Sequence, residues 1–471
     1  MIAPYHCKEF IKSIIAMNRI IVLFLSFLST TSAFSQNDVL DAYIQTALES
    51  NLTLQQKEYS YQNSLEVLNE AKRMFLPTVS FEARYSVAEG GRTMTIPVGD
   101  MLNPVYNNLN AINEGLNIPA PDYPEIDNIE FSFLRSQEQE TKVVAAMPVF
   151  NASIIQNQKI KKGLAEAEKI SVDIYKRELV KEVKDAYMKY LQAEQMYFLY
   201  NNTLTTVNQN LKNRQSLYKN DKITIDEVYA AQAQVKQIEK DLSEVNKNRF
   251  MAVSWFNFLL NRDFDSGIVT DPLVALVISD YNLENLKSTS VSNSEVLMQL
   301  DKYIEIQTNT VKLEKGAALP KISIGAQYGF QGEDYAFNNS GDFASAGIYL
   351  KWDLFTSGQR KSKINQAKID QNITESRKQE VERRVQLEVI DAYYSIQTAM
   401  QGIELANEEL QNYQKSYNLV EKKYQQGMVN YLEYSNSLNN KLNAENKLIL
   451  AQYSYQLEQI KLERLTSTYQ F

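Results

Sequence analysis

Two long stretches without proline constrain the fold more than any other feature of the sequence. Residues 152–217 and 356–423 contain no Pro and little Gly. Each is therefore predicted to form one helix of about 65 residues, near 100 Å long at ~1.5 Å per residue, which no single globular domain accommodates. In the first stretch, apolar residues recur at alternating spacings of four and three, the pattern of a coiled-coil seam. The members of this seam are Leu179, Val183, Ala186, Tyr190, Ala193, Tyr197, Tyr200, Leu204, Val207 and Leu211.

An internal duplication divides the chain into two repeats. All ten seam positions are again apolar or aromatic 206 positions later, from Val385 to Tyr417. The segment that begins at Pro77 likewise resembles the segment that begins at Pro320. Repetition of this kind predicts two copies of one plan, each with a helix, two strands and a long helical hairpin. The expected divisions are a signal peptide at 1–35, a first repeat at 36–262, an equatorial linker at 263–292 and a second repeat at 293–471.

The first repeat is the longer one, and the excess is expected in a long exposed loop at 86–142. This segment holds five prolines among many Asn and acidic residues, a composition typical of loops. Each long helix is expected to reverse at a tip, near residues 220–224 in the first repeat and 425–430 in the second, and to return as an antiparallel partner.

The N-terminal segment has the layout of a secretory signal peptide. Basic residues precede the apolar run Ile20–Leu28, and small residues follow it. The run is shorter than the ~20 residues of a spanning helix, which disfavours the alternative of an uncleaved anchor. Its removal takes away three basic residues and one acidic residue and changes the net charge from −8 to −10. An exported acidic protein of this kind is not expected to bind nucleic acid.

The only cysteine and the only histidine, Cys7 and His6, lie in this leader. Without them the chain cannot build a thiolate nucleophile, a disulfide, an ordinary zinc site or a Ser-His-Asp triad. We therefore expect no enzyme, no cofactor and no metal, although hydrolases that use only carboxylates or a Ser-Lys pair remain open on composition alone.

Four runs of strict apolar and polar alternation predict strands, near residues 78–87, 143–149, 321–330 and 346–354. Each run has about the ~9 to 11 residues of a tilted transmembrane strand. A soluble sandwich with one solvated face gives the same alternation. Four strands flanked by helices, however, provide no second sheet to cover an apolar face, and this favours the membrane.

Four membrane strands cannot close into a barrel, and open edges in lipid are costly. The barrel must then be shared among chains. Because eight strands are filled by their own side chains, three chains with twelve strands are the smallest conducting solution. The polar residues expected to face its lumen are Glu82, Arg84, Gln327, Lys351 and Asp353.

Two strand pairs, two very long helices at an offset of 206 and an equatorial segment together resemble the TolC family of outer-membrane efflux and secretion channels. The resemblance implies a mainly α protein with a small membrane β part. It implies a homotrimer whose shared 12-strand β-barrel, with four strands per chain, is continued by a long α-helical coiled-coil barrel. Such a channel is a passive duct in the outer membrane of a Gram-negative bacterium, in contact with its lipid, and extends into the periplasm. The partners implied are a periplasmic adaptor and an inner-membrane pump of the RND, ABC or MFS type.

The turn of the second hairpin, from Tyr424 through Gly427, resembles the family's Tyr-x-x-Gly turn. By this match Glu433 stands where the family has its first ring of acidic residues at the periplasmic gate, and Asn436 stands at the second. Ordinary carboxylates near a helix start are the alternative. The residues that the resemblance assigns to the gate are Glu433, Glu227, Asn436, Asp226 and Tyr424.

A second function remains open from the sequence, that of an exported structural coiled-coil protein such as a stalk or a periplasmic spacer. It accounts for the seams but leaves the four alternating runs unexplained. The sequence does not indicate which substrate is exported.

Overall fold

The computed structural model describes residues 38–270, 281–335, 337 and 340–469, so the expected signal peptide and part of the expected linker lie outside the described residues. The chain divides into two compact units. The first comprises Met1–Leu65, Gly163–Glu305 and Gln371–Phe471, and the second comprises Glu66–Lys162 and Ile306–Asp370. The described helices are α2 (Asp38–Ser50), α3 (Leu52–Arg73), α4 (Val98–Gly115), α5 (Ala152–Lys219), α6 (Ile225–Leu259), α7 (Leu283–Asn293), α8 (Glu295–Gly316), α9 (Gln359–Gln425) and α10 (Tyr431–Thr466).

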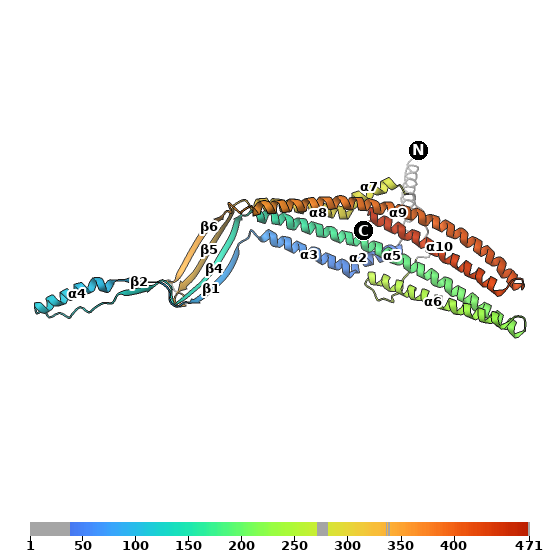
Figure 1. Cartoon of the computed structure of the whole chain (residues 1–471), viewed down its shortest axis with the longest axis horizontal. Helices are drawn as coiled ribbons and strands as arrows, with labels where there is room; N and C mark the ends of the chain where they lie inside the picture. Colours follow the sequence, from blue (N-terminus) through green and yellow to red (C-terminus); the bar gives the residue numbers. More distant parts are fainter. Residues whose placement is uncertain (1–37, 271–280, 336, 338–339, 470–471) are drawn as a thin grey trace, which may run out of the picture. The chain divides into compact units, whose positions relative to one another are not determined.

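Two antiparallel helical hairpins, α5 with α6 and α9 with α10, form most of the first unit (Figure 1). The seam predicted from the heptad spacing is buried where these helices pack, because it is the apolar stripe that each helix can remove from water. Leu179 and Val183 have no exposed surface, and neither has Val389 of the second repeat. A further cluster lies toward the turns and joins the two hairpins through Val207, Ala231, Val235, Ile238, Tyr417, Tyr431, Tyr434, Leu438 and Leu442.

The helix expected at the start of the first repeat is instead two helices, which meet at Asn51. The Asn51 side chain accepts hydrogen bonds from the backbone N–H groups of Thr53 and Leu54, at 3.0 Å each, and so caps α3. Its amide also donates to the carbonyl of Leu259 at 2.9 Å. An Asn that satisfies the start of a new helix explains the break, which apolar periodicity alone does not reveal.

The second unit contains an antiparallel sheet of four strands in the order β1-β4-β5-β6. Phe81 pairs with Val143 and Glu82 pairs with Lys142, so the alternation of side chains separates an apolar face from a polar face. The same register continues into β5 and β6, where Ile324 pairs with Ile348 and Gln327 pairs with Ser345. The strands are β1 (Thr78–Val87), β4 (Gln137–Phe150), β5 (Lys321–Gly332) and β6 (Asp342–Lys351).

The segment predicted to be a long loop at 86–142 is largely ordered secondary structure, and the prediction was wrong in this respect. It holds the two-stranded sheet β2 (Thr93–Ile96) and β3 (Ile129–Ser132) with α4 between them, and β4 already begins at Gln137. Asparagine side chains join α4 to the segment that returns from it. Asn103 and Asn110 of α4 each exchange two hydrogen bonds of 2.9 Å with the backbone of the returning segment, at Ile126 and Tyr123 respectively.

None of the described helices is both long enough and apolar enough to cross a membrane.

Candidate functional site

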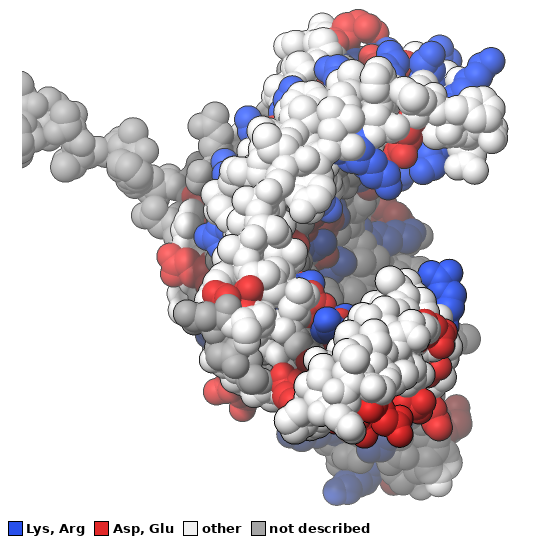
Figure 2. Space-filling view, turned by 90° about the vertical axis from the view of Figure 1, so that its left-hand side faces the viewer, with Lys and Arg blue, Asp and Glu red and all other residues white. Residues whose placement is uncertain are grey.

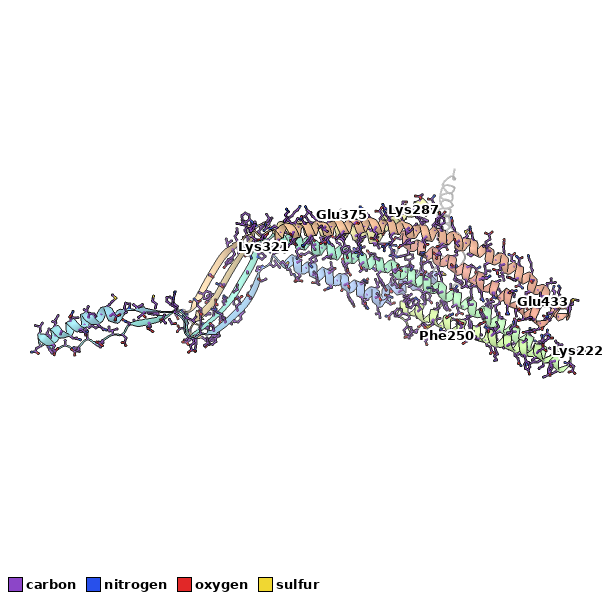
Figure 3. The ribbon with its side chains drawn as sticks, viewed as in Figure 1. Lys222, Phe250, Lys287, Lys321, Glu375 and Glu433 are labelled. Carbon is purple, nitrogen blue, oxygen red and sulfur yellow. The ribbon has the colours of Figure 1, made fainter. Side chains whose placement is uncertain are left out.

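The turns of the two hairpins are the first candidate site, and they fall where the sequence placed them. α5 ends at Lys219 and α6 begins at Ile225, while α9 ends at Gln425 and α10 begins at Tyr431. Lys222 and Glu433 are labelled at these ends in Figure 3. Gly427 has a φ of +74°, a left-handed conformation that favours glycine and explains the Tyr-x-x-Gly pattern of the second turn.

Glu433 is exposed in the first turn of α10. Its backbone N–H donates to the side-chain oxygen of Asn430 at 2.9 Å, so Asn430 is the N-cap of this helix. Asn436 is also exposed on α10, and Asp226 is exposed in the first turn of α6. These three side chains are free to meet solvent, as a gate requires. The carboxylates of Glu433 and Asp226 also suit the positive end of a helix dipole.

Glu227 has a different environment, because Arg214 of α5 reaches it. The guanidinium donates to the Glu227 carboxylate at 2.6 Å, and the two side chains are 8% and 28% exposed. The same guanidinium lies 3.9 Å from the centroid of the Tyr424 ring, a cation–π distance. Burial lowers the pKa of Arg214 while Glu227 raises it, and Arg214 remains charged at any ordinary pH. Arg214 therefore joins one hairpin to the other.

Tyrosines complete this contact between hairpins. Tyr424 and Tyr434 stack with ring centroids 4.5 Å apart, and Tyr417 and Tyr434 place their hydroxyl groups 3.4 Å apart. Tyr431 donates to the side-chain oxygen of Gln234 on α6. Burial is the main cause that raises the pKa of Tyr431, to about 12, and burial also raises the pKa values of Tyr417 and Tyr434. The tyrosines are therefore neutral, and their hydroxyl groups act as hydrogen-bond partners within the contact.

The five residues assigned to the gate thus separate into two groups. Tyr424 and Glu227 contact Arg214 within the chain, whereas Glu433, Asn436 and Asp226 are exposed at the turns. The sequence analysis did not indicate Arg214. The available sign was its place three residues after Leu211, where the apolar seam continues and a cation is unexpected.

The polar face of the four-stranded sheet is the second candidate site. It carries the predicted Glu82 and Arg84, and it also carries three residues of β4 that the sequence analysis placed in a loop. Arg84 lies 3.7 Å from Glu138 and 3.5 Å from Glu140. Lys142 lies 2.9 Å from Glu140 and 3.8 Å from Glu82. Acidic and basic groups therefore alternate across β1 and β4.

The other predicted lumen residues extend this face. Gln327 donates to the hydroxyl of Ser345 across β5 and β6 at 3.0 Å. Lys351 ends β6 on the same face, and Asp353 follows beyond the end of the strand. Among the residues that the structure describes, no group of three or more His, Cys, Asp and Glu side chains could hold a metal ion.

Comparison with known proteins shows which class of protein has this fold. Residues 286–468 match the model of the family described as "Outer membrane efflux protein". No curated protein matches the sequence. The fold is similar to that of the Campylobacter jejuni CmeC outer membrane channel, with a TM-score of 0.73 and 14% identity over 91% of this chain and 85% of that one.

Two further solved structures are alike to a similar degree. The outer membrane protein VceC from Vibrio cholerae gives a TM-score of 0.69 and 13% identity, with 91% of this chain and 95% of that one covered. The Neisseria gonorrhoeae MtrE outer membrane channel gives a TM-score of 0.67 and 14% identity, with 91% and 88% covered.

The chain therefore has the fold of the TolC-like outer-membrane channels. The family match covers its residues 286–468, and similarity of fold extends over 91% of the chain. The fold class expected from the sequence is confirmed, and the family match over residues 286–468 agrees with the expected resemblance. The description of the matched family names the outer membrane, which is the location that the resemblance implies.

Proposed function

We propose that three copies of this chain form a passive export duct that crosses the outer membrane as a shared barrel of twelve strands and continues into the periplasm as paired helical hairpins. A periplasmic adaptor and an inner-membrane pump of the RND, ABC or MFS type would engage it there. The pump would select the substrate, because the described polar face of the sheet carries both signs of charge and no cluster of side chains that would select one ligand.

The proposal rests on one observation, which is that the open sheet has one apolar face and one charged face. Large apolar side chains project from one face, with Phe81 71% exposed, Ile348 77% and Leu350 64%. The opposite face carries the ion pairs of Arg84 and Lys142. A soluble protein rarely exposes a contiguous apolar surface of this kind, whereas a lipid-facing wall requires it.

The edges of the sheet support sharing among copies. β1 and β6 each pair on one side only within the described sheet, so each presents a row of backbone donors and acceptors. In lipid such edges must pair, and pairing β6 of one copy with β1 of the next closes a barrel.

Aromatic side chains at both ends of the sheet fit the two membrane interfaces. At one end Tyr85 stacks on Tyr335 with centroids 5.7 Å apart, and Phe330 meets Phe337 at 5.3 Å. At the other end Trp352 is 55% exposed, and its indole N–H donates to the carbonyl of Ala318 at 3.0 Å. Indole and phenol groups suit positions where one part of the ring is apolar and another is hydrated.

Mass and conductance test this function together. Protein purified in detergent should have the mass of three chains, and after reconstitution it should give discrete conductance steps in a planar bilayer. A single-chain mass without conductance would contradict the proposal and would favour the structural coiled-coil protein.

A further inference from the structure

The helix α4, which lies in the segment between β1 and β4, carries an apolar seam that the described part of the chain leaves uncovered. Figure 1 shows α4 with β2 beyond the four-stranded sheet. In chain order α4 connects the end of β1 to the start of β4, whereas α3 precedes β1 and α5 follows β4. Its apolar residues recur at spacings of four, three, four, three and four, the heptad pattern of a helix that packs against other helices. The seam consists of Val98, Leu102, Val105, Leu109, Ile112 and, at the C-cap of the helix, Leu116.

The seam is distinct from the face of α4 that the chain itself occupies. Asn103, Tyr106 and Asn110 contact the returning segment 117–128, through the asparagine hydrogen bonds and a stack of Tyr106 on Tyr123 at 5.1 Å. Each of these positions follows a seam position by one residue, so the two faces lie side by side on the helix. Val105 is 51% exposed, and Ile112 is 52% exposed.

Glycine explains why the returning segment lies where it does. A side chain at Gly99 would place its Cβ 2.1 Å from the carbonyl oxygen of Ile126. This close approach holds the segment on the asparagine face and leaves the apolar seam open. Among the described residues, the way this segment folds therefore accounts for the exposed seam.

The order of the seam residues indicates how many helices would share it. Leucine stands at every a position (Leu102, Leu109 and Leu116), and a β-branched residue stands at every d position (Val98, Val105 and Ile112). In parallel coiled coils, leucine at a with isoleucine at d favours three or four strands over two. Copies related by a rotation axis present the same helix in parallel, as such a bundle requires.

Charge argues against a lipid headgroup surface as the occupant. Between Thr93 and Ser132 the chain has six acidic residues and no Lys or Arg. Figure 2 looks onto the left-hand side of Figure 1, and the nearest part of its surface is mostly white and red. An anionic surface would repel it, whereas the seam itself carries no charge.

We propose that the α4 helices of the three copies pack against one another through this seam and form a parallel bundle over the outer end of the barrel. The inference rests on the trimer of the proposed function and adds a second contact between copies. The bundle narrows the outer mouth of the duct, at the ends of β1 and β4 that are joined through α4.

Cysteine cross-linking tests the bundle directly, on a Cys7→Ser background that removes the only native thiol. Val105→Cys places a thiol at a d position, where helices of a bundle approach closely. Oxidation of the full-length protein in membranes should link two of the three copies through a disulfide. Asn107→Cys, exposed on the opposite side of the same helix, is the matched control and should give several-fold less product.

The outcomes separate this inference from the trimer. Mass is measured on the same samples. A trimer in which Val105→Cys and Asn107→Cys cross-link equally poorly overturns the bundle and leaves the proposed function intact. A single-chain mass overturns both. If a polarity-sensitive label on the thiol of the Val105→Cys variant reports an apolar setting without cross-linking, lipid covers the seam and the bundle is likewise overturned.

A charge inside the seam provides the second variant. Leu109→Glu places three like charges in one layer of the bundle, so the helices should separate while the barrel keeps the trimer together. The Val105→Cys cross-link should then fall several-fold and the single-channel conductance should rise. Asn107→Glu adds the same charge on the side of the helix opposite to the seam and should change neither, and equal behaviour of the two variants would count against the bundle.

Discussion

The two hairpin turns are built on one plan but use their acidic residues differently. In the first turn Glu227 is paired with Arg214, which also lies against Tyr424 of the second turn. In the second turn Glu433 is exposed, and Asn430 caps the helix on which it stands. Repetition of a sequence pattern therefore does not repeat a role. One acid pairs with the arginine that joins the two hairpins, and the other is exposed to solvent.

Removal of Arg214 should have the largest effect on this contrast. Arg214→Ala leaves Glu227 partly buried without its partner and removes the cation from the Tyr424 ring. We expect a loss of about 2–3 kcal/mol in the local stability of the contact, measured as faster amide hydrogen exchange in residues 208–235. Lys212→Ala, an exposed cation on the same helix, is the control and should leave exchange unchanged. Equal exchange in both variants would show that the hairpins do not depend on the ion pair.

Raising the pH should weaken the same contact through its tyrosines. The pKa of Tyr431 is raised to about 12 from an ordinary value of 10.0, so the folded contact holds the proton after an unfolded tyrosine has lost it. The stabilisation is therefore complete below pH 10 and is lost between pH 10 and pH 12, by on the order of 2 kcal/mol. Tyr417 and Tyr434, whose pKa values are also raised, act in the same direction.

Thermal melting followed over this pH range measures the effect. Tyr431→Phe should start from a lower melting temperature, because Gln234 loses its partner, but should fall less steeply with pH. A slope identical to that of the unmodified protein would remove Tyr431 from the explanation.

The N-cap of the second turn should contribute less. Asn430→Ala removes the acceptor for the Glu433 N–H and should cost about 1 kcal/mol, seen as faster exchange in the first turn of α10. Asn430→Asp keeps an acceptor and should retain most of the protection. The first turn offers a comparison, because Thr224 makes no such side-chain hydrogen bond and Thr224→Ala should change little.

Glu433→Gln should have almost no effect on stability, within about 0.5 kcal/mol, because the side chain is exposed. If three copies of Glu433 surround a narrow mouth, the change should instead weaken block of the channel by divalent cations several-fold, since it removes the local negative potential. Planar bilayer recordings measure this block. Glu408→Gln, exposed on α9 away from the turn, is the control, and block that is equal in all three proteins would exclude Glu433 from the gate.

The sequence predicted those parts of the fold that depend on periodicity. Heptad spacing located the seam at Leu179 and Val183, and alternation located all four strands of the sheet. The prediction failed where hydrogen bonds from single side chains, and not a periodic pattern of burial, determine the structure. Asn51 divides a helix by capping, and Asn103 and Asn110 organise α4 through hydrogen bonds to backbone. A loop and an asparagine-rich ordered segment have similar amino-acid compositions, so composition did not distinguish between them.

The candidate site was predictable only in part, for a related reason. The turn at Gly427 follows from local conformation, and the alternation of Glu82 and Arg84 follows from strand geometry. The partners of these residues come from elsewhere in the chain. Arg214 reaches the second hairpin only after folding, and Glu140 joins the polar face only because β4 extends back to Gln137.

The alternating charges on the polar face of the sheet determine how a channel lined by this face would act on a passing molecule. Each carboxylate of Glu82, Glu138 and Glu140 has a cationic nitrogen within 4.0 Å, supplied by Arg84 or Lys142. Fields from such close opposite charges cancel over short distances. A lining so nearly compensated would be indifferent to whether its cargo is cationic, anionic or neutral, and any sorting by sign would then fall to the exposed acids at the hairpin ends.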